Sequence, residues 1–461
     1  MSDMLQESRI SHTHRRDALR FIAGGILGCT FGARSRALTV GPAQPPLTIA
    51  GLKVTPIALP DPPIMAASGC HGPYFLRNVV ELKVEGGIVG IAEVPGGERV
   101  TRALQQAEKL VVGQNVFAYR KFAHELQALG MGCYAGVELA CLDASARATG
   151  RRLCELVGGP VRESVEFAAY LFYRYAADHP VVLSDPHLVD SRGRGDHALD
   201  SWGEVRSAET MAAMAAQFRD RWGFRVFKLK GGVLDPEIER DSLKAMAAKL
   251  GREALLRIDP NGRWKTSTAI RIGKEIANLP LEYYEDPVQG QAAMAEVRRA
   301  TGLKMSTNMC VTSFGHIPEA FKLKPIDVLL CDHHYFGGFA GCQALGPVCT
   351  AAGWSMSQHS NSHAGVTMAA MIHLAASIPE LTMASDTHYP WLIETADIIE
   401  GPKLIIRDGR MNVPAGPGLG VKLDQDKLAR AHEAYTKCEM RGRDDRTLMR
   451  RLEPGWTGAL L

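Results

Sequence analysis

The chain has 461 residues, which is too long for one ordinary domain and is consistent with a barrel of about 250 residues plus a second unit. Its residues are 46% hydrophobic and 22% charged, so we expect packed globular cores rather than a disordered or fibrous chain. The formal net charge of +3 gives no reason to expect a nucleic-acid partner, and no apolar stretch reaches the roughly 18 residues of a membrane span.

The first 37 residues are similar to an export signal. Arg15 and Arg16 precede a short, glycine-rich apolar run, and Ser35 and Ala37 place small residues at a possible cleavage point. This pattern resembles a twin-arginine signal, followed by a linker over 38–47, and predicts export of a folded protein to the periplasm. A basic leader on a cytoplasmic enzyme and a lipid anchor on Cys29 are the alternatives.

Residues 48–160 are expected to form an α+β capping domain. Two alternating apolar segments, 47–57 and 77–87, have the pattern of strands, and the second turns at a Gly-Gly pair into a third. Helical periodicity then runs from about residue 101 to residue 150. We therefore predict an antiparallel sheet covered by helices.

Residues 161–412 have the rhythm of a (β/α) barrel. Short apolar runs alternate with helical segments such as 239–250 and 266–277. The long first connection, 174–206, indicates a lid or specificity loop at the active-site face. The segment 413–461 is polar and helical, and we expect it to pack on the capping domain. The eight strands are predicted at 165–172, 223–230, 255–260, 281–286, 304–309, 327–332, 354–359 and 381–386.

Polar side chains recur at the ends of these strands. Asp259, Glu285 and Asn308 end three consecutive strands. Because the carboxyl ends of barrel strands meet in one mouth, the three side-chain oxygens should converge. Mg²⁺ prefers oxygen ligands and keeps positions for water and substrate, so the sequence predicts a magnesium site. A single acidic residue at a strand end is commonly structural; the three in register carry the prediction.

Lys228 and Lys230 lie two residues apart on the second strand, so both side chains should point to the barrel interior. Each ammonium group should lower the pKa of the other, and a nearby metal ion should lower it further. We therefore expect a lysine that acts as a base near neutral pH. The alternative is a surface strand with two solvated lysines, which the flanking Phe227 and Gly231 argue against.

A second candidate base is His359, one strand beyond Asp332. A carboxylate bonded to one ring nitrogen fixes the tautomer and makes the other nitrogen a better base. His388, at the end of the last strand, is expected to stabilise negative charge on a carboxylate. Three neighbours of His359 are predicted to hold the substrate. They are Ser360, Asn361 and His363.

Several motifs of the chain match those of one family. In the barrel they are Phe227-Lys-Leu-Lys-Gly-Gly-Val, Asp259-Pro-Asn-Gly, Glu285-Asp-Pro, Thr307-Asn-Met, His359-Ser-Asn-x-His363 and Asp386-Thr-His388. Outside it they are Ser68-Gly-x-His71, Glu93-Val-Pro-Gly-Gly-Glu98 and Gly442-Arg-Asp-Asp445. In these motifs, from about residue 50 to the end, the chain resembles the enolase superfamily and, within it, the glucarate dehydratases.

The resemblance implies a (β/α) barrel with an α+β capping domain, Mg²⁺ at the three strand-end oxygens, and Lys230 and His359 as opposed bases. It implies that Asn261 lies near the metal or binds a carboxylate. The implied substrate contacts are His71, Tyr170, Phe172 and Arg443. The implied reaction removes the proton α to a carboxylate of a glucarate-like aldaric acid and eliminates the β-hydroxyl, giving a keto-deoxy diacid. The expected partners are a small acid sugar and further copies of the chain.

Two alternatives to a dehydratase are left open. Bases on both faces of the substrate would also permit epimerisation, which describes a racemase or epimerase of an acid sugar or hydroxy acid. The other alternative is a non-catalytic periplasmic binding protein on the same barrel. A missing base or metal ligand would favour that last alternative, and none is missing from the sequence.

Overall fold

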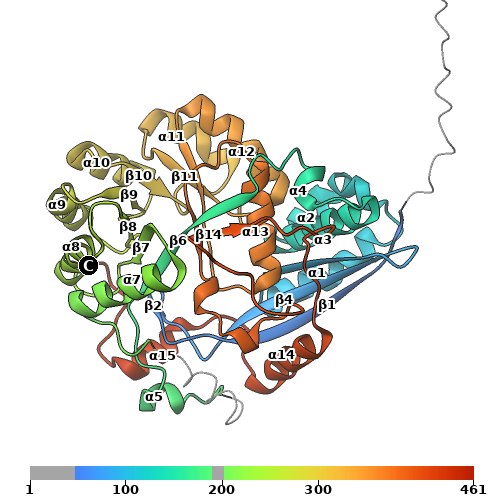
Figure 1. Ribbon diagram of the computed structural model, residues 1–461, viewed down its shortest axis with the longest axis horizontal. Helices are drawn as coiled ribbons and strands as arrows, with labels where there is room; N and C mark the ends of the chain where they lie inside the picture. The colour runs from blue at the N-terminus through green and yellow to red at the C-terminus, as the bar shows by residue number, and fades with distance from the viewer. Residues whose placement is uncertain (1–46, 189–201) are drawn as a thin grey trace, which may run out of the picture. The chain divides into compact units, whose positions relative to one another are not determined.

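An antiparallel sheet and a barrel-like parallel sheet organise the chain in the computed structural model, which describes residues 47–188 and 202–461 (Figure 1). The predicted signal segment 1–37, with Arg15, Arg16 and Cys29, lies outside the described residues, as does nearly all of the predicted linker. The middle of the long connection 174–206 is likewise outside them.

The antiparallel sheet has the strand order β1 (Ile49–Pro60), β4 (Tyr74–Val84) and β5 (Val89–Pro95). It packs against α3 (Met131–Thr149), which is buried along most of its length. Gly90 of β5 permits the close approach, because a Cβ there would lie 2.0 Å from the carbonyl oxygen of Ala140. The other elements here are β2 (Met65–Ala66), β3 (Gly69–Cys70), α1 (Glu98–Val111), η1 (Val116–Phe122), α2 (Ala123–Leu129) and α4 (Leu153–Leu156).

The second sheet is a parallel barrel, and all eight predicted barrel strands are confirmed, although the last begins at Ser385 rather than at 381. In spatial order they are β12 (Ser355–Gln358), β11 (Val328–Cys331), β10 (Met305–Thr307), β9 (Leu281–Glu285), β8 (Leu255–Asp259), β7 (Val226–Lys230), β6 (Ser164–Phe172) and β13 (Ser385–Thr387). The gap between β12 and β13 is bridged by a bond from the Met383 amide to the Met356 carbonyl, 3.4 Å, and by one from Ser357 Oγ to the Ala384 carbonyl, 2.9 Å.

The barrel helices begin and end at residues suited to those positions. Asp235 caps α8 by accepting a bond from the Glu237 amide, Pro236 occupies its first turn, and Gly251 follows its end. The helices that follow the strands are α5 (Pro180–Leu183), α7 (Ala208–Trp222), α8 (Pro236–Leu250), α9 (Thr266–Ile276), α10 (Gln291–Thr301), α11 (Ile317–Leu323), α12 (Gly338–Ala352) and α13 (Gly365–Ser377), with the short 3-10 turns η2 (Phe314–His316), η3 (Tyr389–Trp391) and η4 (Glu394–Ala396).

Two buried carboxylates join the antiparallel unit to the barrel. Glu93 of β5 accepts bonds from the amides of Ala364 and Thr367 at the start of α13, both 2.9 Å. Glu138 of α3 accepts bonds from the amides of Phe339 and Ala340 at the start of α12, 2.6 and 3.1 Å. Because helix N-termini carry unpaired N–H groups and partial positive charge, these carboxylates fix the unit over the barrel.

The C-terminal segment returns to the first sheet. α14 (Gln425–Cys438) packs on β1, where His432 Nδ1 lies 2.7 Å from the Pro56 carbonyl oxygen. α15 (Asp445–Leu452) lies beside β3, and β14 (Arg410–Asn412) pairs antiparallel with the beginning of β6. This path carries α15 to the same side of the barrel as the β2–β3 hairpin, where both border the cleft described below.

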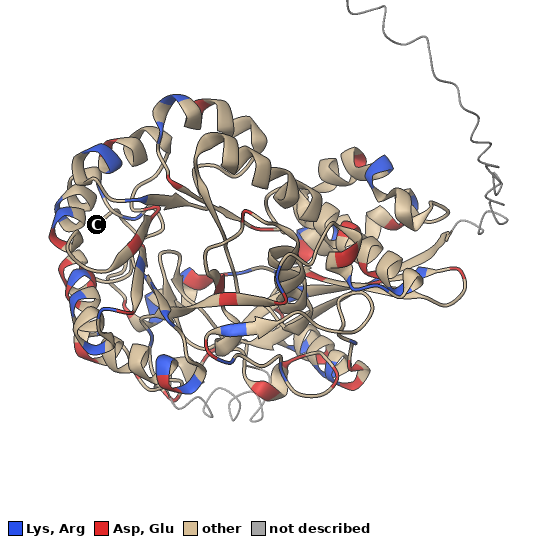
Figure 2. Ribbon diagram, turned by 45° about the horizontal axis from the view of Figure 1, so that its top comes forward, with Lys and Arg blue, Asp and Glu red and all other residues tan. Residues whose placement is uncertain are grey.

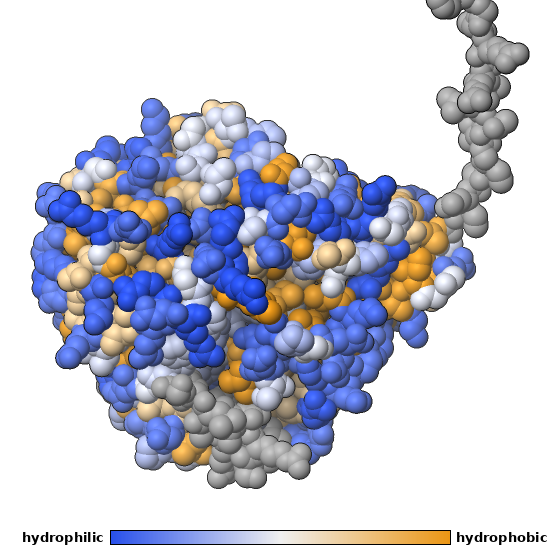
Figure 3. Space-filling model, viewed as in Figure 1, coloured by the Kyte–Doolittle hydropathy of each residue, from blue (hydrophilic) through white to orange (hydrophobic). Residues whose placement is uncertain are grey.

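Charged residues of both signs are spread over the helices around the barrel (Figure 2), as the 53 basic and 50 acidic residues lead one to expect. Hydrophilic residues predominate on the face drawn in Figure 3, with apolar areas between them. Among the described residues, no helix combines the length and the apolar character needed to cross a bilayer.

Candidate active site

The register of the barrel brings the predicted residues to one mouth. Lys230 pairs with Asp259 on the neighbouring strand and with Phe172 on the other side. In parallel strands, residues in register point to the same face, and alternate residues share it. Lys228, two residues before Lys230, therefore also points inward, in register with Tyr170.

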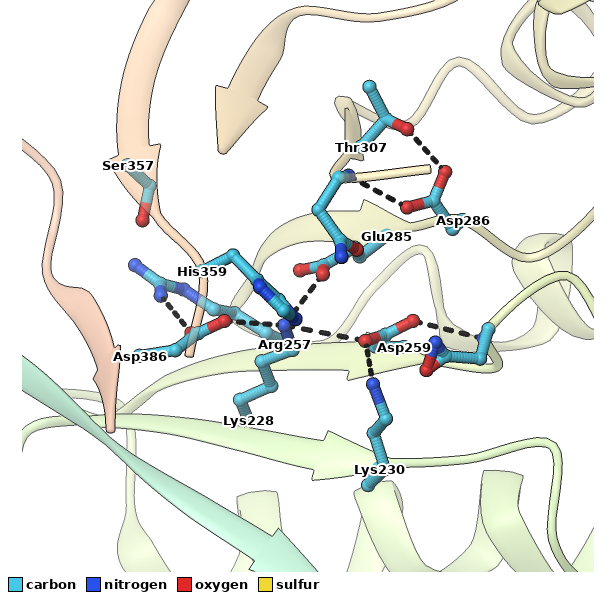
Figure 4. A network of polar contacts seen from close by, with 12 residues as sticks. Lys228, Lys230, Arg257, Asp259, Glu285, Asp286, Thr307, Ser357, His359 and Asp386 are labelled. Carbon is cyan, nitrogen blue, oxygen red and sulfur yellow. Dashed lines mark hydrogen bonds and ion pairs between the residues drawn. The ribbon is translucent and has the colours of Figure 1, made fainter. Parts of the chain in front are cut away.

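An ion-pair network fills the floor of this mouth (Figure 4). Lys228 Nζ lies 2.6 Å from Glu285 Oε1, 2.6 Å from Asp386 Oδ2 and 3.4 Å from Asp259 Oδ2. Lys230 Nζ lies 2.6 Å from the same Asp259 Oδ2. All five side chains are buried or nearly so, so the charges act on one another through little water.

The network changes the predicted titration of the lysines. Burial lowers the pKa of Lys228, but Asp386 and Glu285 raise it more, so the pKa lies well above its ordinary value. Burial and Lys228 lower the pKa of Lys230, whereas Asp259 raises it, and the net shift is again upward. The surrounding carboxylates therefore outweigh the repulsion between the two ammonium groups. The prediction of a base near neutral pH also includes a nearby metal ion, and it stays a prediction.

The three predicted metal ligands fit a hard divalent cation. Glu285 Oε2 is buried and has no hydrogen-bond partner. Burial and then the nearby Asp259 raise the pKa of Glu285 well above its ordinary value, so positive charge beside it would be stabilising. One end of the Asn308 amide lies 3.3 Å from Glu285 Oε1, and the other lies 3.1 Å from His359 Nε2. Hydrogen bonding places the NH₂ group toward Glu285, whereas a cation would require the oxygen there.

A second group of potential ligands is Asp332, His333 and His334, whose ligand atoms lie within 4.8 Å of one another. Asp332 is already engaged, because Oδ2 lies 2.8 Å from His359 Nδ1 and Oδ1 accepts a bond from the His334 amide. Two imidazoles also suit a softer ion than Mg²⁺. The oxygen-rich group of Asp259, Glu285 and Asn308 is thus the better magnesium site.

The predicted pair of Asp332 and His359 is formed by the ends of two neighbouring strands. Burial opposes the ionisation of Asp332, but hydrogen bonds from His334 and His359 outweigh it and hold the pKa of the carboxyl far below its usual range. The ionised Asp332 therefore accepts the Nδ1 proton of His359, so that Nε2 is the ring nitrogen able to take up another proton.

The strand ends open into a cleft of about 800 Å³. Lys230 and His359 both line it, so two potential bases face the same volume. Other predicted residues that line it are Asn261, Asn308, Asp332, His71, Tyr170, Phe172, Asn361, His388 and Arg443. Another cavity, of about 530 Å³ beside η3, holds none of the predicted site residues.

Two predicted substrate contacts lie behind the cleft wall. Ser360 Oγ accepts a bond from the His388 amide, 3.1 Å, and so holds that residue in place. His363 stacks on Tyr389 with ring centroids 5.9 Å apart.

Burial and then the charges of His71 and His363 hold the pKa of His388 well below its ordinary value. His388 therefore faces the cleft as a neutral imidazole.

Residues from outside the barrel close the cleft. His71 lies next to β3, and its Nδ1 is 3.1 Å from Asp61 Oδ2. Arg443 precedes α15, and it donates from Nε to Asp445 Oδ2 at 2.6 Å while its terminal nitrogen lies 2.5 Å from His71 Nε2. The predicted substrate contacts from the two ends of the chain are thus connected to each other.

Sequence reasoning missed three charged residues of the site. Asp386 accepts a hydrogen bond from Lys228, and Arg257 Nη1 lies 3.3 Å from Asp386 Oδ1. Asp286 accepts bonds from Thr307 Oγ1, 2.5 Å, and from the Asn308 amide, 2.9 Å. Arg257 lies two residues before Asp259 on β8, so strand alternation could have predicted that both side chains share one face. No pattern in the sequence indicates the partners of Asp286.

Comparisons with known proteins agree with this geometry. The Enolase C-terminal domain-like family matches residues 210–427. A probable glucarate dehydratase of Streptomyces coelicolor is 37% identical over 437 residues, which cover 89% of this chain and 97% of that protein.

Solved structures agree as well. An enolase of Pseudomonas fluorescens with bound magnesium, potassium and tartrate superposes with a TM-score of 0.84 at 36% identity, covering 90% of this chain and 99% of that one. An enolase of Mycobacterium smegmatis complexed with tartrate gives a TM-score of 0.83 at 37% identity, covering 91% and 99%.

Proposed function

Because this chain belongs to the enolase superfamily, we propose that it is a Mg²⁺-dependent dehydratase of an acid sugar, acting on a glucarate-like aldaric acid. The observation that carries the proposal is that Lys230 and His359 face one cleft, with Asp259, Glu285 and Asn308 beside them. Two bases beside an oxygen-rich metal site suit removal of a proton α to a carboxylate.

Asp259, Glu285 and Asn308 would hold Mg²⁺, which supplies Lewis-acid stabilisation of the charge that develops on the substrate carboxylate. A cation on these carboxylates would also offset the negative charge that raises the pKa of Lys230, and so would bring this amine toward the range of a base. Lys228, held between Glu285 and Asp386, provides a fixed positive charge on the same floor.

In the proposed reaction His359 Nε2 or Lys230 Nζ takes the α-proton, depending on the configuration of the substrate. Asp332 stabilises the imidazolium that forms on His359. The electron pair of the broken C–H bond forms the carbon–carbon double bond as the β-hydroxyl departs, and a protonated base supplies the proton that makes it water. The enol then takes up a proton at the former β-carbon and releases its hydroxyl proton, which gives the 2-keto-3-deoxy diacid.

The neutral His388 and the amide of Asn261 line the cleft as hydrogen-bond donors for the substrate carboxylate. His71 and Arg443 line the same cleft and are placed to hold the rest of the substrate. Asn261 has a backbone φ of 52°, a conformation that costs energy and that clusters at functional sites, which supports a functional role for this turn.

The test is a panel of acid sugars incubated with the full-length protein and Mg²⁺, followed by measurement of keto-acid formation. We expect keto acid from at least one aldaric acid. Epimerisation is the second candidate, because two bases face one cleft; it would appear as an inverted α-carbon without keto acid. Absence of both products and of α-proton exchange in deuterated water would contradict the proposed function.

A further inference from the structure

Three arginines line the cleft, and they differ in how their charge is balanced. They are Arg263, Arg443 and Arg446. The cleft volume of about 800 Å³ lies toward the upper end of the range of about 300–1,000 Å³ for small-molecule sites. The cleft therefore has room for groups well beyond the carboxylate next to the metal site.

The charge of Arg443 is already matched within the protein. Its Nε and its terminal nitrogen both lie 2.6 Å from Asp445 Oδ2. The neighbouring His71 is likewise held by Asp61 at 3.1 Å. These two side chains can donate hydrogen bonds to a ligand, but the carboxylates beside them cancel much of the positive potential that would attract an anion.

Arg263 and Arg446 differ from Arg443 in this respect. In the described part of the chain neither guanidinium lies within ion-pair distance of a carboxylate, and the side chain of Arg446 makes no hydrogen bond that offsets its charge. Arg263 donates to the carbonyl oxygen of Gly458, while its Nε is buried without a partner. Burial and then the nearby charge of Arg446 lower the pKa of Arg263, so the two guanidinium groups act on each other unfavourably.

The backbone holds Arg263 firmly at this position. Its amide donates to the Pro260 carbonyl, 3.1 Å, and its own carbonyl accepts from the Leu461 amide, 2.8 Å. Its side-chain stem packs over Gly232, where a Cβ would lie 2.8 Å from Arg263 Cβ. Gly232 follows Lys230 by two residues, so the stem of Arg263 is fixed beside the loop that carries a candidate base. A side chain whose stem is already packed loses less entropy when it binds a ligand.

We propose that Arg263 and Arg446 form a second anion subsite, which binds an anionic group at the far end of the substrate. This inference rests on the proposed function and deepens it, since it assigns two residues to the far anionic group of the substrate, which is a carboxylate or a phosphate. An anion between the two guanidinium groups relieves their repulsion and meets the planar donor sets that arginine presents to carboxylate and phosphate.

The test is calorimetric titration of the full-length, Mg²⁺-loaded protein with three acids. Gluconate has one anionic end, glucarate has two carboxylates, and 6-phosphogluconate has a carboxylate and a phosphate. All proteins carry Lys230→Ala and His359→Ala, so that binding is measured without turnover. Arg263→Gln and Arg446→Gln are compared with Arg450→Gln, which removes the same charge from α15 at an exposed position that does not line the cleft.

We expect Arg263→Gln and Arg446→Gln each to raise the Kd of the dianionic ligands about tenfold or more, because a charge-assisted hydrogen bond is lost. The Kd of gluconate should change less than about twofold, and Arg450→Gln should leave all three affinities unchanged. A larger loss of affinity for glucarate identifies a carboxylate as the group that the subsite binds. A larger loss of affinity for 6-phosphogluconate identifies a phosphate.

Equal affinities in the parent protein with the two alanine substitutions and in the glutamine variants would overturn the subsite, as would an equal loss of affinity for gluconate. If none of the three acids binds, the proposed substrate class is wrong, and titration with inorganic phosphate then tests the subsite by itself. In that case weaker phosphate binding by the Arg263→Gln and Arg446→Gln variants supports the subsite, and unchanged binding rejects it.

Discussion

Asp332 and His359 are joined by a contact of 2.8 Å between Oδ2 and Nδ1, while Oδ1 of the same carboxylate is held by the His334 amide, also at 2.8 Å. Both oxygens of Asp332 are therefore engaged, and the carboxylate cannot turn away from the imidazole. His334 in turn lies 3.0 Å through Nε2 from the Glu93 carbonyl oxygen, so the orientation of His359 depends on the antiparallel unit as well as on the barrel.

Asp332→Asn should lower kcat about 10³- to 10⁴-fold, because the amide would favour the His359 tautomer that has its proton on Nε2. The measurement is keto-acid formation together with α-proton exchange. Asp220→Asn, at an exposed position of α7, is the control. A variant that keeps activity within about fivefold of wild type would show that Asp332 does not set the His359 tautomer.

Lys230→Ala and His359→Ala should each abolish exchange of the α-proton for one epimer of the substrate. The two side chains line one cleft from different strands, and we propose that they reach opposite faces of a bound acid. The measurement is deuterium incorporation by NMR for both epimers. Normal exchange of both epimers by both variants would remove the assignment of opposed bases.

Removal of the metal should abolish turnover and leave the fold intact. Asp259→Ala and Glu285→Ala should behave alike, since each removes a candidate ligand from the floor of the cleft. Activity is measured after exhaustive chelation and again after Mg²⁺ is restored, with circular dichroism to check folding. The control is Glu253→Gln, which changes an exposed residue just before β8. Full activity of the chelated protein would rule out an essential metal.

Glu138 should make the unfolding free energy depend on pH. Burial raises its pKa from 4.5 to about 7, although the amides of α12 favour the ionised form. The pKa of Glu138 is higher in the folded protein than in the unfolded chain. Its contribution to the free energy of unfolding is therefore fully present below pH 4.5 and is lost as the pH rises toward 7. Its full size is about 3 kcal/mol.

The measurement is denaturant unfolding of wild type, Glu138→Gln and the exposed control Glu125→Gln between pH 4.5 and 8. As the pH rises, the free energy of unfolding of the wild type should fall relative to that of Glu138→Gln. A constant difference over this range would mean that Glu138 does not titrate there.

We propose that the chain is exported through a twin-arginine signal, which would deliver a folded, metal-loaded barrel to the periplasm. Replacement of both Arg15 and Arg16 by lysine should leave the uncleaved chain in the cytoplasm. The measurement is cell fractionation with determination of the N-terminal residue. A native protein that keeps Met1 to Ala37 and fractionates with cytoplasmic markers would contradict this proposal, and the proposed reaction would be unaffected.

The order of elements and the meeting of the strand-end residues could be predicted from the sequence. A β/α repeat fixes how far apart the strand ends lie along the chain, and barrel closure brings those ends together. Barrel closure therefore brings together five of the predicted residues, independently of the details of packing. They are Lys230, Asp259, Glu285, Asn308 and His359. Alternation along β7 likewise put Lys228 and Lys230 on one face.

Only the tertiary structure decided how these groups act on one another. The upward pKa shift of Lys228 depends on Asp386, 158 residues away, and the cleft position of Arg443 depends on the path of the C-terminal segment back to β3. Side-chain burial, charge pairing and the free charge of Arg263 beside Arg446 arise between distant segments. Local periodicity determines which face a side chain takes, but the electrostatic field at that face is a sum over neighbours that only folding brings within a few ångströms.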